Sequence, residues 1–173
     1  MKKHVLGLLL LAGAAQSAEI PNPLIDYGAF QSGVEHVGTV RETHRVTERE
    51  FVRMSRDAST VILDARSAEK YALLHVKGAR NLSLPDITEA ELAKIIPSKS
   101  TRILIYCNNN FSNEPAAFPA KNLSASLNVY TMNVLFAYGY TNVYELGPLI
   151  DIRKSIIPFE RAEPVAQVTP VRR

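Results

Sequence analysis

Two short apolar runs rich in branched residues constrain the fold of this 173-residue chain more than any other feature. One spans residues 60–63 and ends at Asp64, and the other spans residues 102–106 and ends at Cys107. Runs of this length and composition are typical of strands that a sheet buries on both faces. Helical patterns alternate with them, so the order of elements predicts an α/β fold with a central, mainly parallel sheet flanked by helices on both sides.

Capping signals and apolar spacing predict four short helices in the same region. The first three begin with a hydroxyl residue followed by an acidic one, and the fourth follows the Cys107 strand and ends at a glycine. Their first or last residues are Thr47, Ser67, Thr88 and Gly139. A short strand over 142–146 and a helix over 148–157 complete the predicted domain, which spans residues 46–157.

The amino terminus has the order of a secretory signal peptide over residues 1–18. Two lysines precede an apolar run over residues 5–15, and small residues follow. A run of about eleven residues is too short to cross a bilayer, which takes roughly twenty. We therefore expect cleavage near Ala18 or Glu19, export to the periplasm or the medium, and no stable membrane anchor. Cleavage lowers the net charge from +3 to about +1, which gives no reason to expect nucleic acid as a partner.

Two segments outside the predicted domain carry weaker patterns. Residues 19–45 mix prolines and glycines with short alternating stretches such as residues 34–37, so they predict an irregular arm with a small hairpin. Residues 158–173 are rich in proline and charge, and they predict a disordered tail.

Cys107 is the only cysteine in the sequence, so no internal disulfide can form even in an exported chain. A thiol at the end of a strand, just before a turn-rich stretch, is a common arrangement for a nucleophile. The alternative is a small buried residue that ends a core strand. One cysteine and four scattered histidines offer no ligand spacing for a metal, and no cofactor is implied.

Four stretches of the chain, in the correct order, resemble the single-domain rhodaneses: residues 61–66 (VILDAR), 75–81 (HVKGARN), 103–107 (ILIYC) and 138–146 (YGYTNVYEL). The resemblance covers about Val46 to Leu146. It implies a central parallel sheet and a catalytic cysteine, here Cys107, that takes sulfur from a donor such as thiosulfate. The cysteine then carries this sulfur as a persulfide and passes it to a thiophilic acceptor. N–H groups of a tight loop and of a helix N-terminus stabilise such a thiolate.

The loop after Cys107 departs from the family pattern. Typical rhodaneses close this loop in a few residues, often with glycine and arginine or serine, and then start a helix. Here Cys107 and Gly139 are 32 positions apart, which indicates an insertion that carries Pro115 and Pro119. The residue six positions after the cysteine is Asn113 instead of arginine, which argues against a dual-specificity phosphatase, because a bidentate guanidinium is what matches phosphate. The tryptophan typical of the end of the family domain is also missing.

The candidate substrate-binding residues follow the cysteine in the chain, and they are Asn108, Asn109, Asn110, Phe111 and Lys121. The three asparagines offer amide N–H groups to an oxyanion, although asparagine clusters are also typical of turns. The lysine is the only basic residue between Cys107 and Ile152, so it is either the anion-binding residue or an ordinary exposed helix residue. The phenylalanine either lines a substrate pocket or, with Phe118, packs the insertion onto the domain.

Three further polar residues belong to the motifs of the resemblance. Asp64 and Arg66 follow a buried strand at its carboxyl end, where α/β sheets place their ligand sites. We expect them to form a structural ion pair that fixes the loops around the site. His75 is expected on a surface turn that orders the next strand.

These residues support three functional hypotheses. The first is an exported sulfurtransferase with Cys107 as nucleophile and a small sulfur-containing anion or a thiol acceptor as its partners. The second is a catalytically inactive rhodanese-like domain that binds a protein partner or a small anion. The third is a thiol redox protein, which would need a partner to finish its cycle because it lacks a resolving cysteine.

Overall fold

The structure is a computed structural model that describes residue 20 and residues 22–162. The predicted signal peptide, residues 1–18, and most of the predicted tail lie outside the described residues. Within the described part of the chain, no helix combines the length and the apolar character needed to cross a membrane.

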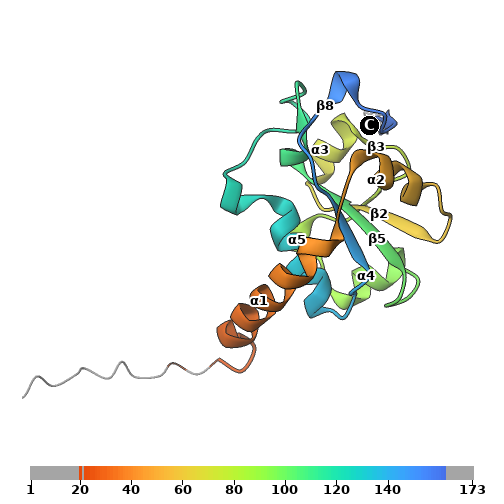
Figure 1. Cartoon of the computed structure of the whole chain (residues 1–173). Helices are drawn as coiled ribbons and strands as arrows, with labels where there is room; N and C mark the ends of the chain where they lie inside the picture. Colours follow the sequence, from red (N-terminus) through yellow and green to blue (C-terminus); the bar gives the residue numbers. More distant parts are fainter. Residues whose placement is uncertain (1–19, 21, 163–173) are drawn as a thin grey trace, which may run out of the picture.

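Five parallel strands form the centre of the fold (Figure 1). In spatial order they are β1 (Arg45–Val46), β7 (Val143–Leu146), β5 (Arg102–Tyr106), β2 (Thr60–Asp64) and β4 (Arg80–Asn81). The two apolar runs of the sequence are the neighbours β5 and β2, paired from Thr60 opposite Arg102 to Asp64 opposite Tyr106. Because all these pairs are parallel, their carboxyl ends meet at one edge of the sheet.

Helices cover both faces of the sheet, as the sequence predicts. One face carries α1 (Tyr27–His44), α4 (Glu89–Ile95) and α5 (Leu127–Ala137), and the other carries α2 (Glu48–Ser55) and α3 (Ala68–Leu73). Successive residues of the central strands alternate between the two hydrophobic clusters, with Leu63 and Ile105 facing α4 and α5, and Ile62 and Leu104 facing α2. The predicted α/β fold is confirmed.

The predicted caps are present. Thr47 Oγ1 accepts the Glu50 N–H at 3.3 Å while the Glu50 carboxylate accepts the Thr47 N–H at 3.4 Å, which completes a capping box at the start of α2. Gly139 ends α5 with a φ of +80°, a backbone conformation that glycine adopts without steric cost. The next N–H, that of Tyr140, bonds back to the carbonyl of Leu135 at 2.9 Å.

Two small sheets and four 3₁₀ turns connect the main elements. β3 (His75–Val76) pairs antiparallel with β9 (Phe159–Glu160), and β6 (Phe111–Ser112) pairs parallel with β8 (Ile150–Asp151). The 3₁₀ turns are η1 (Leu84–Asp86), η2 (Asn108–Asn110), η3 (Leu123–Ala125) and η4 (Ile152–Lys154). The second small sheet ties the start of the insertion after Cys107 to the end of the domain.

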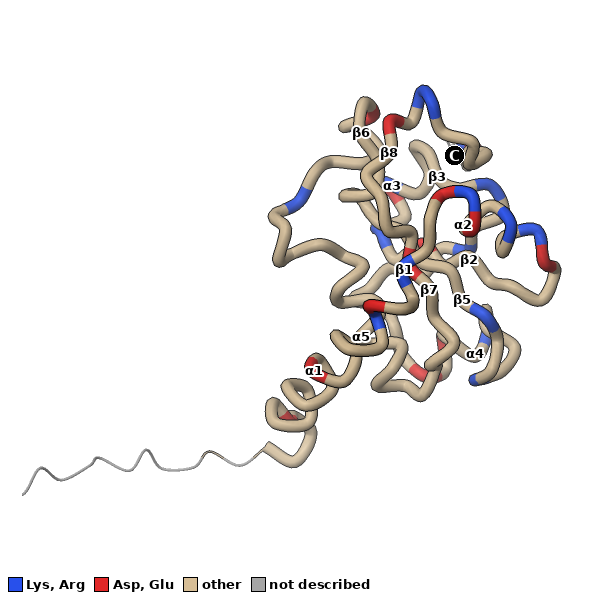
Figure 2. Tube along the Cα trace, in the orientation of Figure 1, with Lys and Arg blue, Asp and Glu red and all other residues tan. Residues whose placement is uncertain are grey.

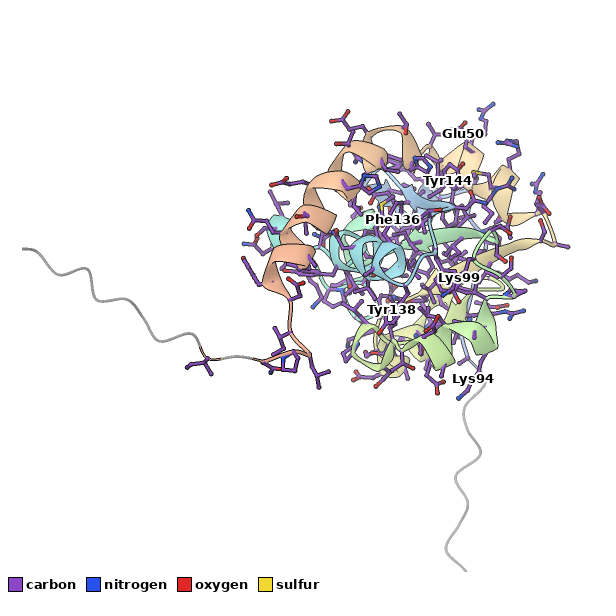
Figure 3. The ribbon with its side chains drawn as sticks, turned by 90° about the horizontal axis from the view of Figure 1, so that it is seen from below. Glu50, Lys94, Lys99, Phe136, Tyr138 and Tyr144 are labelled. Atoms are coloured by element: carbon purple, nitrogen blue, oxygen red, sulfur yellow. The ribbon has the colours of Figure 1, made fainter. Side chains whose placement is uncertain are left out.

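The irregular arm predicted over residues 19–45 is wrong, since most of it is the 18-residue helix α1. The predicted hairpin at residues 34–37 lies inside this helix. Asp26 caps it by accepting the N–H of Ala29 at 2.8 Å. Packing on α5 stabilises a helix that its glycines disfavour. Figure 3 shows α1 alongside α5, where His36 meets Phe136 with ring centroids 6.1 Å apart.

Two predictions for the end of the chain are also wrong. Residues 148–157 do not form a helix, because the pairing of β8 with β6 holds the start of this stretch extended and η4 follows it. The predicted tail starts too early, since residues 159–160 form β9 and the Lys77 N–H donates to the Pro158 carbonyl at 2.8 Å. Cross-strand pairing therefore orders these residues despite their polar composition.

Candidate active site

Cys107 directly follows β5 at the carboxyl edge of the sheet, the edge at which open α/β sheets bind ligands. The residue is 1% exposed, and it lines a cavity of about 270 Å³. The walls of this cavity come from the end of α1, the turn after Cys107, the start of α5 and the end of β7. The thiol is therefore buried in the wall of a small hollow and does not project into solvent.

Ser126 stands next to the sulfur, with its Oγ 3.4 Å from Cys107 Sγ. Ser126 is also the residue that precedes the first turn of α5. The N-terminal end of a helix carries a partial positive charge, which favours negative charge on a neighbouring sulfur. The insertion therefore separates cysteine and helix in the sequence, but the folded chain brings the helix N-terminus back to the thiol.

Asn110 organises the backbone around Cys107. Its Oδ1 accepts the Cys107 N–H at 2.8 Å and an N–H of Asn128 at 3.0 Å. Its Nδ2 donates to the carbonyls of Leu146 at 2.7 Å and Pro148 at 3.2 Å. The asparagine lines the cavity, but its amide is fully used in connecting the cysteine turn to α5 and to the end of β7.

The other two asparagines have different surroundings. Asn109 also lines the cavity, and its side-chain amide exchanges two hydrogen bonds with the backbone of Lys121, at 2.8 and 3.0 Å. Asn108 is buried and lines a separate, mostly apolar hollow of about 410 Å³. Two of the three predicted asparagines, Asn109 and Asn110, therefore hold the turn and the insertion through their side chains.

Lys121 and Phe111 lie away from the thiol cavity. Both line the apolar hollow, and neither lines the cavity that contains Cys107. The ring of Phe111 packs against Phe118 and Phe159, with centroids 4.7 and 5.1 Å apart. Of the two roles considered for this phenylalanine, the geometry matches packing of the insertion onto the domain.

Charged groups that sequence reasoning missed line the cavity instead. Arg41 of α1 binds the carboxylate of Glu145 through Nε at 2.8 Å and Nη2 at 2.6 Å. Arg45 of β1 binds the same carboxylate through Nε at 3.1 Å and the carbonyl of Gly147 through Nη2 at 3.1 Å. Figure 2 shows basic and acidic positions close together where α1 runs into β1. An acidic residue inside the apolar strand 143–146 was the available signal, because a buried carboxylate requires partners.

Asn128, at the start of α5, was also missed. It is buried in the wall of the cavity, and its Oδ1 has no hydrogen-bond donor among the described residues.

Asp64 and Arg66 form an ion pair beneath the site, with Nη2 and Oδ2 2.5 Å apart and both side chains buried. Burial opposes the charge on Arg66, but the hydrogen bond and the charge of Asp64 outweigh this effect, so the pKa of Arg66 rises above its usual value. Arg66 also donates to the carbonyl of Ala117 at 2.9 Å and lies over the ring of Phe118 at 4.2 Å. The ion pair therefore anchors the insertion at Ala117 and Phe118.

His75 is not on the surface turn that the sequence predicted. It is buried in β3 and stacks on Tyr71 with ring centroids 3.6 Å apart. Its Nδ1 lies 2.8 Å from the Tyr71 carbonyl, and its Nε2 lies 3.4 Å from Glu160 of β9. The pairing of β3 with β9 covers the ring, which explains its burial.

The site combines a strand-end thiol, the start of a helix and two arginines paired with one carboxylate. A sequence profile of the rhodanese-like domain family matches residues 47–147. The chain therefore belongs to the rhodanese-like domain family.

Individual relatives show how far the likeness extends. Thiosulfate sulfurtransferase PspE of Escherichia coli (strain K12) is 30% identical over 90 residues, which cover 52% of this chain and 71% of that protein. A rhodanese with anions from E. coli is 23% identical, with a TM-score of 0.41, over 60% of this chain and 99% of that one. The rhodanese-like domain of the Alr3790 protein of Anabaena sp. is 20% identical, with a TM-score of 0.49, over 75% and 86% of the two chains.

Proposed function

We propose that this protein is an exported sulfurtransferase in which Cys107 carries sulfur as a persulfide. The observation that supports this most is the position of Cys107, which lines a cavity beside the N-terminal end of α5 with its Sγ 3.4 Å from Ser126 Oγ. At this position the partial positive charge of the helix end stabilises a thiolate, and the Ser126 hydroxyl can donate a hydrogen bond to it. Membership of the rhodanese-like family supports the same chemistry.

The reaction has two steps. The Cys107 thiolate attacks the outer sulfur of thiosulfate, the S–S bond of the donor breaks, and sulfite leaves with the electron pair. Cys107 then bears a persulfide. An acceptor such as cyanide attacks the terminal sulfur, thiocyanate leaves, and the thiolate returns. Ser126 stabilises the negative charge on the cysteine sulfur before the first step and after the second.

Export rests on the signal-peptide pattern of residues 1–18. Because these residues lie outside the described part of the chain, its support comes from the sequence alone. Fractionation of cells that produce the full chain tests it: a shortened product outside the cytoplasm supports export, and an uncleaved product in the cytoplasm contradicts it.

The sulfur-transfer activity is tested with purified protein, thiosulfate and cyanide, with thiocyanate as the readout. Wild-type protein is expected to form thiocyanate and to gain the mass of one sulfur atom on Cys107 when only thiosulfate is added. Cys107→Ser is expected to do neither. Equal activity in the two proteins would refute the proposal.

One observation favours a second function, that of an inactive rhodanese-like domain that binds an anion or a protein. The amides of Asn109 and Asn110 are bound to other parts of the chain, and the thiol is almost fully buried. If this function is correct, iodoacetamide should modify Cys107 as slowly as it modifies a buried core thiol. Rapid modification near neutral pH would instead support the transferase.

A further inference from the structure

We propose that Arg41 and Arg45, which precede the family-matched segment, form the oxyanion-binding site of the Cys107 cavity. This inference rests on the proposed sulfur transfer for its biological meaning, because it assigns the residues that hold the charged end of the sulfur donor. The ligand class is a small oxyanion such as thiosulfate or sulfite.

The lining of the cavity carries more positive than negative charge. Its charged lining residues, within the described part of the chain, are Arg41, Arg45 and Glu145. Two guanidinium groups against one carboxylate leave a net positive charge in the cavity that Cys107 lines. Because Cys107 lines the same cavity of about 270 Å³, an anion held by these groups lies within reach of the thiol.

Both arginines are held in place by the same buried carboxylate. The Glu145 side chain is 2% exposed and receives hydrogen bonds from both guanidinium groups. The arginine side chains are more open, at 34% and 49% exposure for Arg41 and Arg45. In each of them Nε and Nη2 bind the protein, and Nη1 has no acceptor among the described residues. Glu145 therefore holds both guanidinium groups in place, and each guanidinium group keeps N–H groups that can bind a ligand.

Lys121 and Arg66, the basic residues that the sequence places near the site, do not line the thiol cavity. Lys121 lines the apolar hollow and not the thiol cavity. Arg66 is buried beneath the site, where it binds Asp64 and the carbonyls of Leu74 and Ala117. The positive charge beside the thiol therefore comes from the end of α1 and from β1, outside the matched residues 47–147.

The test compares two reagents of similar size that alkylate Cys107, anionic iodoacetate and neutral iodoacetamide. The ratio of their rate constants measures the potential at the sulfur and does not need sulfur transfer. In Arg45→Gln and in Arg41→Gln, we expect the iodoacetate to iodoacetamide ratio to fall about five-fold, as for the loss of one charge a few ångströms away in a partly wet site. Arg53→Gln is the control, since Arg53 is exposed on α2 and does not line the cavity.

Glu145→Gln should change the iodoacetate to iodoacetamide ratio in the opposite direction. It removes the negative charge from the cavity and is expected to raise the same ratio, whereas general damage to the fold would not reverse the direction. The wild-type ratio should also fall as salt rises, because mobile ions screen the field. These two measurements keep the inference testable if an arginine variant fails to fold.

Activity assays separate this inference from the proposed function. If the protein transfers sulfur, both arginine variants should show a raised KM for thiosulfate and little change with a neutral organic trisulfide as donor. A protein without transferase activity that still shows the charge-dependent alkylation ratios keeps the oxyanion site and loses the proposed function. Unchanged ratios in Arg41→Gln, Arg45→Gln and Glu145→Gln would overturn the oxyanion site, whatever the activity.

Discussion

Replacement of Asn110 by alanine should loosen the thiol site at a measurable cost in stability. The side chain makes four hydrogen bonds, with the N–H of Cys107, an N–H of Asn128 and the carbonyls of Leu146 and Pro148. Each is worth about 1 kcal/mol net, so Asn110→Ala should lower the free energy of unfolding by about 4 kcal/mol. For a chain of this size the melting temperature then falls by roughly 10 °C.

Two further variants sharpen this prediction. Asn110→Asp keeps the acceptor for the Cys107 N–H but places a carboxylate against two carbonyl oxygens, so it should be at least as destabilising at neutral pH and partly recover when acid protonates the new carboxyl group. Asn109→Ala is the matched control, because it loses two solvent-exposed hydrogen bonds to Lys121 and should cost less than about 1 kcal/mol.

Urea unfolding followed by far-ultraviolet circular dichroism measures these differences in a chain that has no tryptophan. The rate of Cys107 alkylation by iodoacetamide gives the local readout, and it should rise in Asn110→Ala relative to Asn109→Ala. If Asn110→Ala unfolds at the same urea concentration as Asn109→Ala, the assignment of Asn110 as the organiser of the site is wrong.

Three other perturbations have expected outcomes. Arg66→Leu leaves the buried carboxylate of Asp64 without its ion-pair partner and should lower the free energy of unfolding by about 3–5 kcal/mol in urea titrations; a loss below about 1 kcal/mol would contradict this. Burial, followed by the charge of Asp64, raises the pKa of Tyr106 well above the ordinary 10.0. The unfolded chain therefore loses this proton first, so the stability contribution is complete below about pH 10 and is lost as the pH rises further, and Tyr106→Phe should reduce that slope. Val37→Ala removes the buried contact of α1 and should cost about 1–3 kcal/mol, with a raised KM for thiosulfate if α1 positions Arg41; unchanged urea midpoints would show that α1 is not held by this residue.

The parts of the fold that the sequence predicted are those specified by local patterns. The apolar, branched run at 60–63 is typical of a buried strand, and the Thr47 and Glu50 pair bonds its own helix end, so both are visible in a few neighbouring residues. The helix α1 has no such pattern. It contains three glycines between Tyr27 and His44, and its contacts with α5 come from residues far away in the sequence. Local propensity therefore predicted the wrong structure where tertiary packing decides.

The position of the thiol in the fold was predictable, and its neighbours were not. Cys107 follows a buried strand, as the apolar run before it predicts. Lys121 was chosen because it is the only basic residue between Cys107 and Ile152. Two hydrogen bonds hold its backbone on Asn109, and the residue lines the neighbouring hollow. Arg41 reaches the cavity because α1 runs into β1, and β1 pairs with the strand that carries Glu145. This proximity depends on strand order, which the spacing of residues along the chain does not reveal.

The geometry of the insertion has a consequence for how such domains can diversify. Cys107 is held by the central strand and Ser126 by the start of α5, and the polypeptide that joins them is anchored separately by Arg66, Asn109 and the pairing of β6 with β8. The packing of the sheet and its covering helices therefore fixes the position of the sulfur relative to the start of α5. The joining polypeptide can accordingly change in length and composition across homologues, and so acquire new recognition surfaces, while the thiol keeps its position beside the start of the helix.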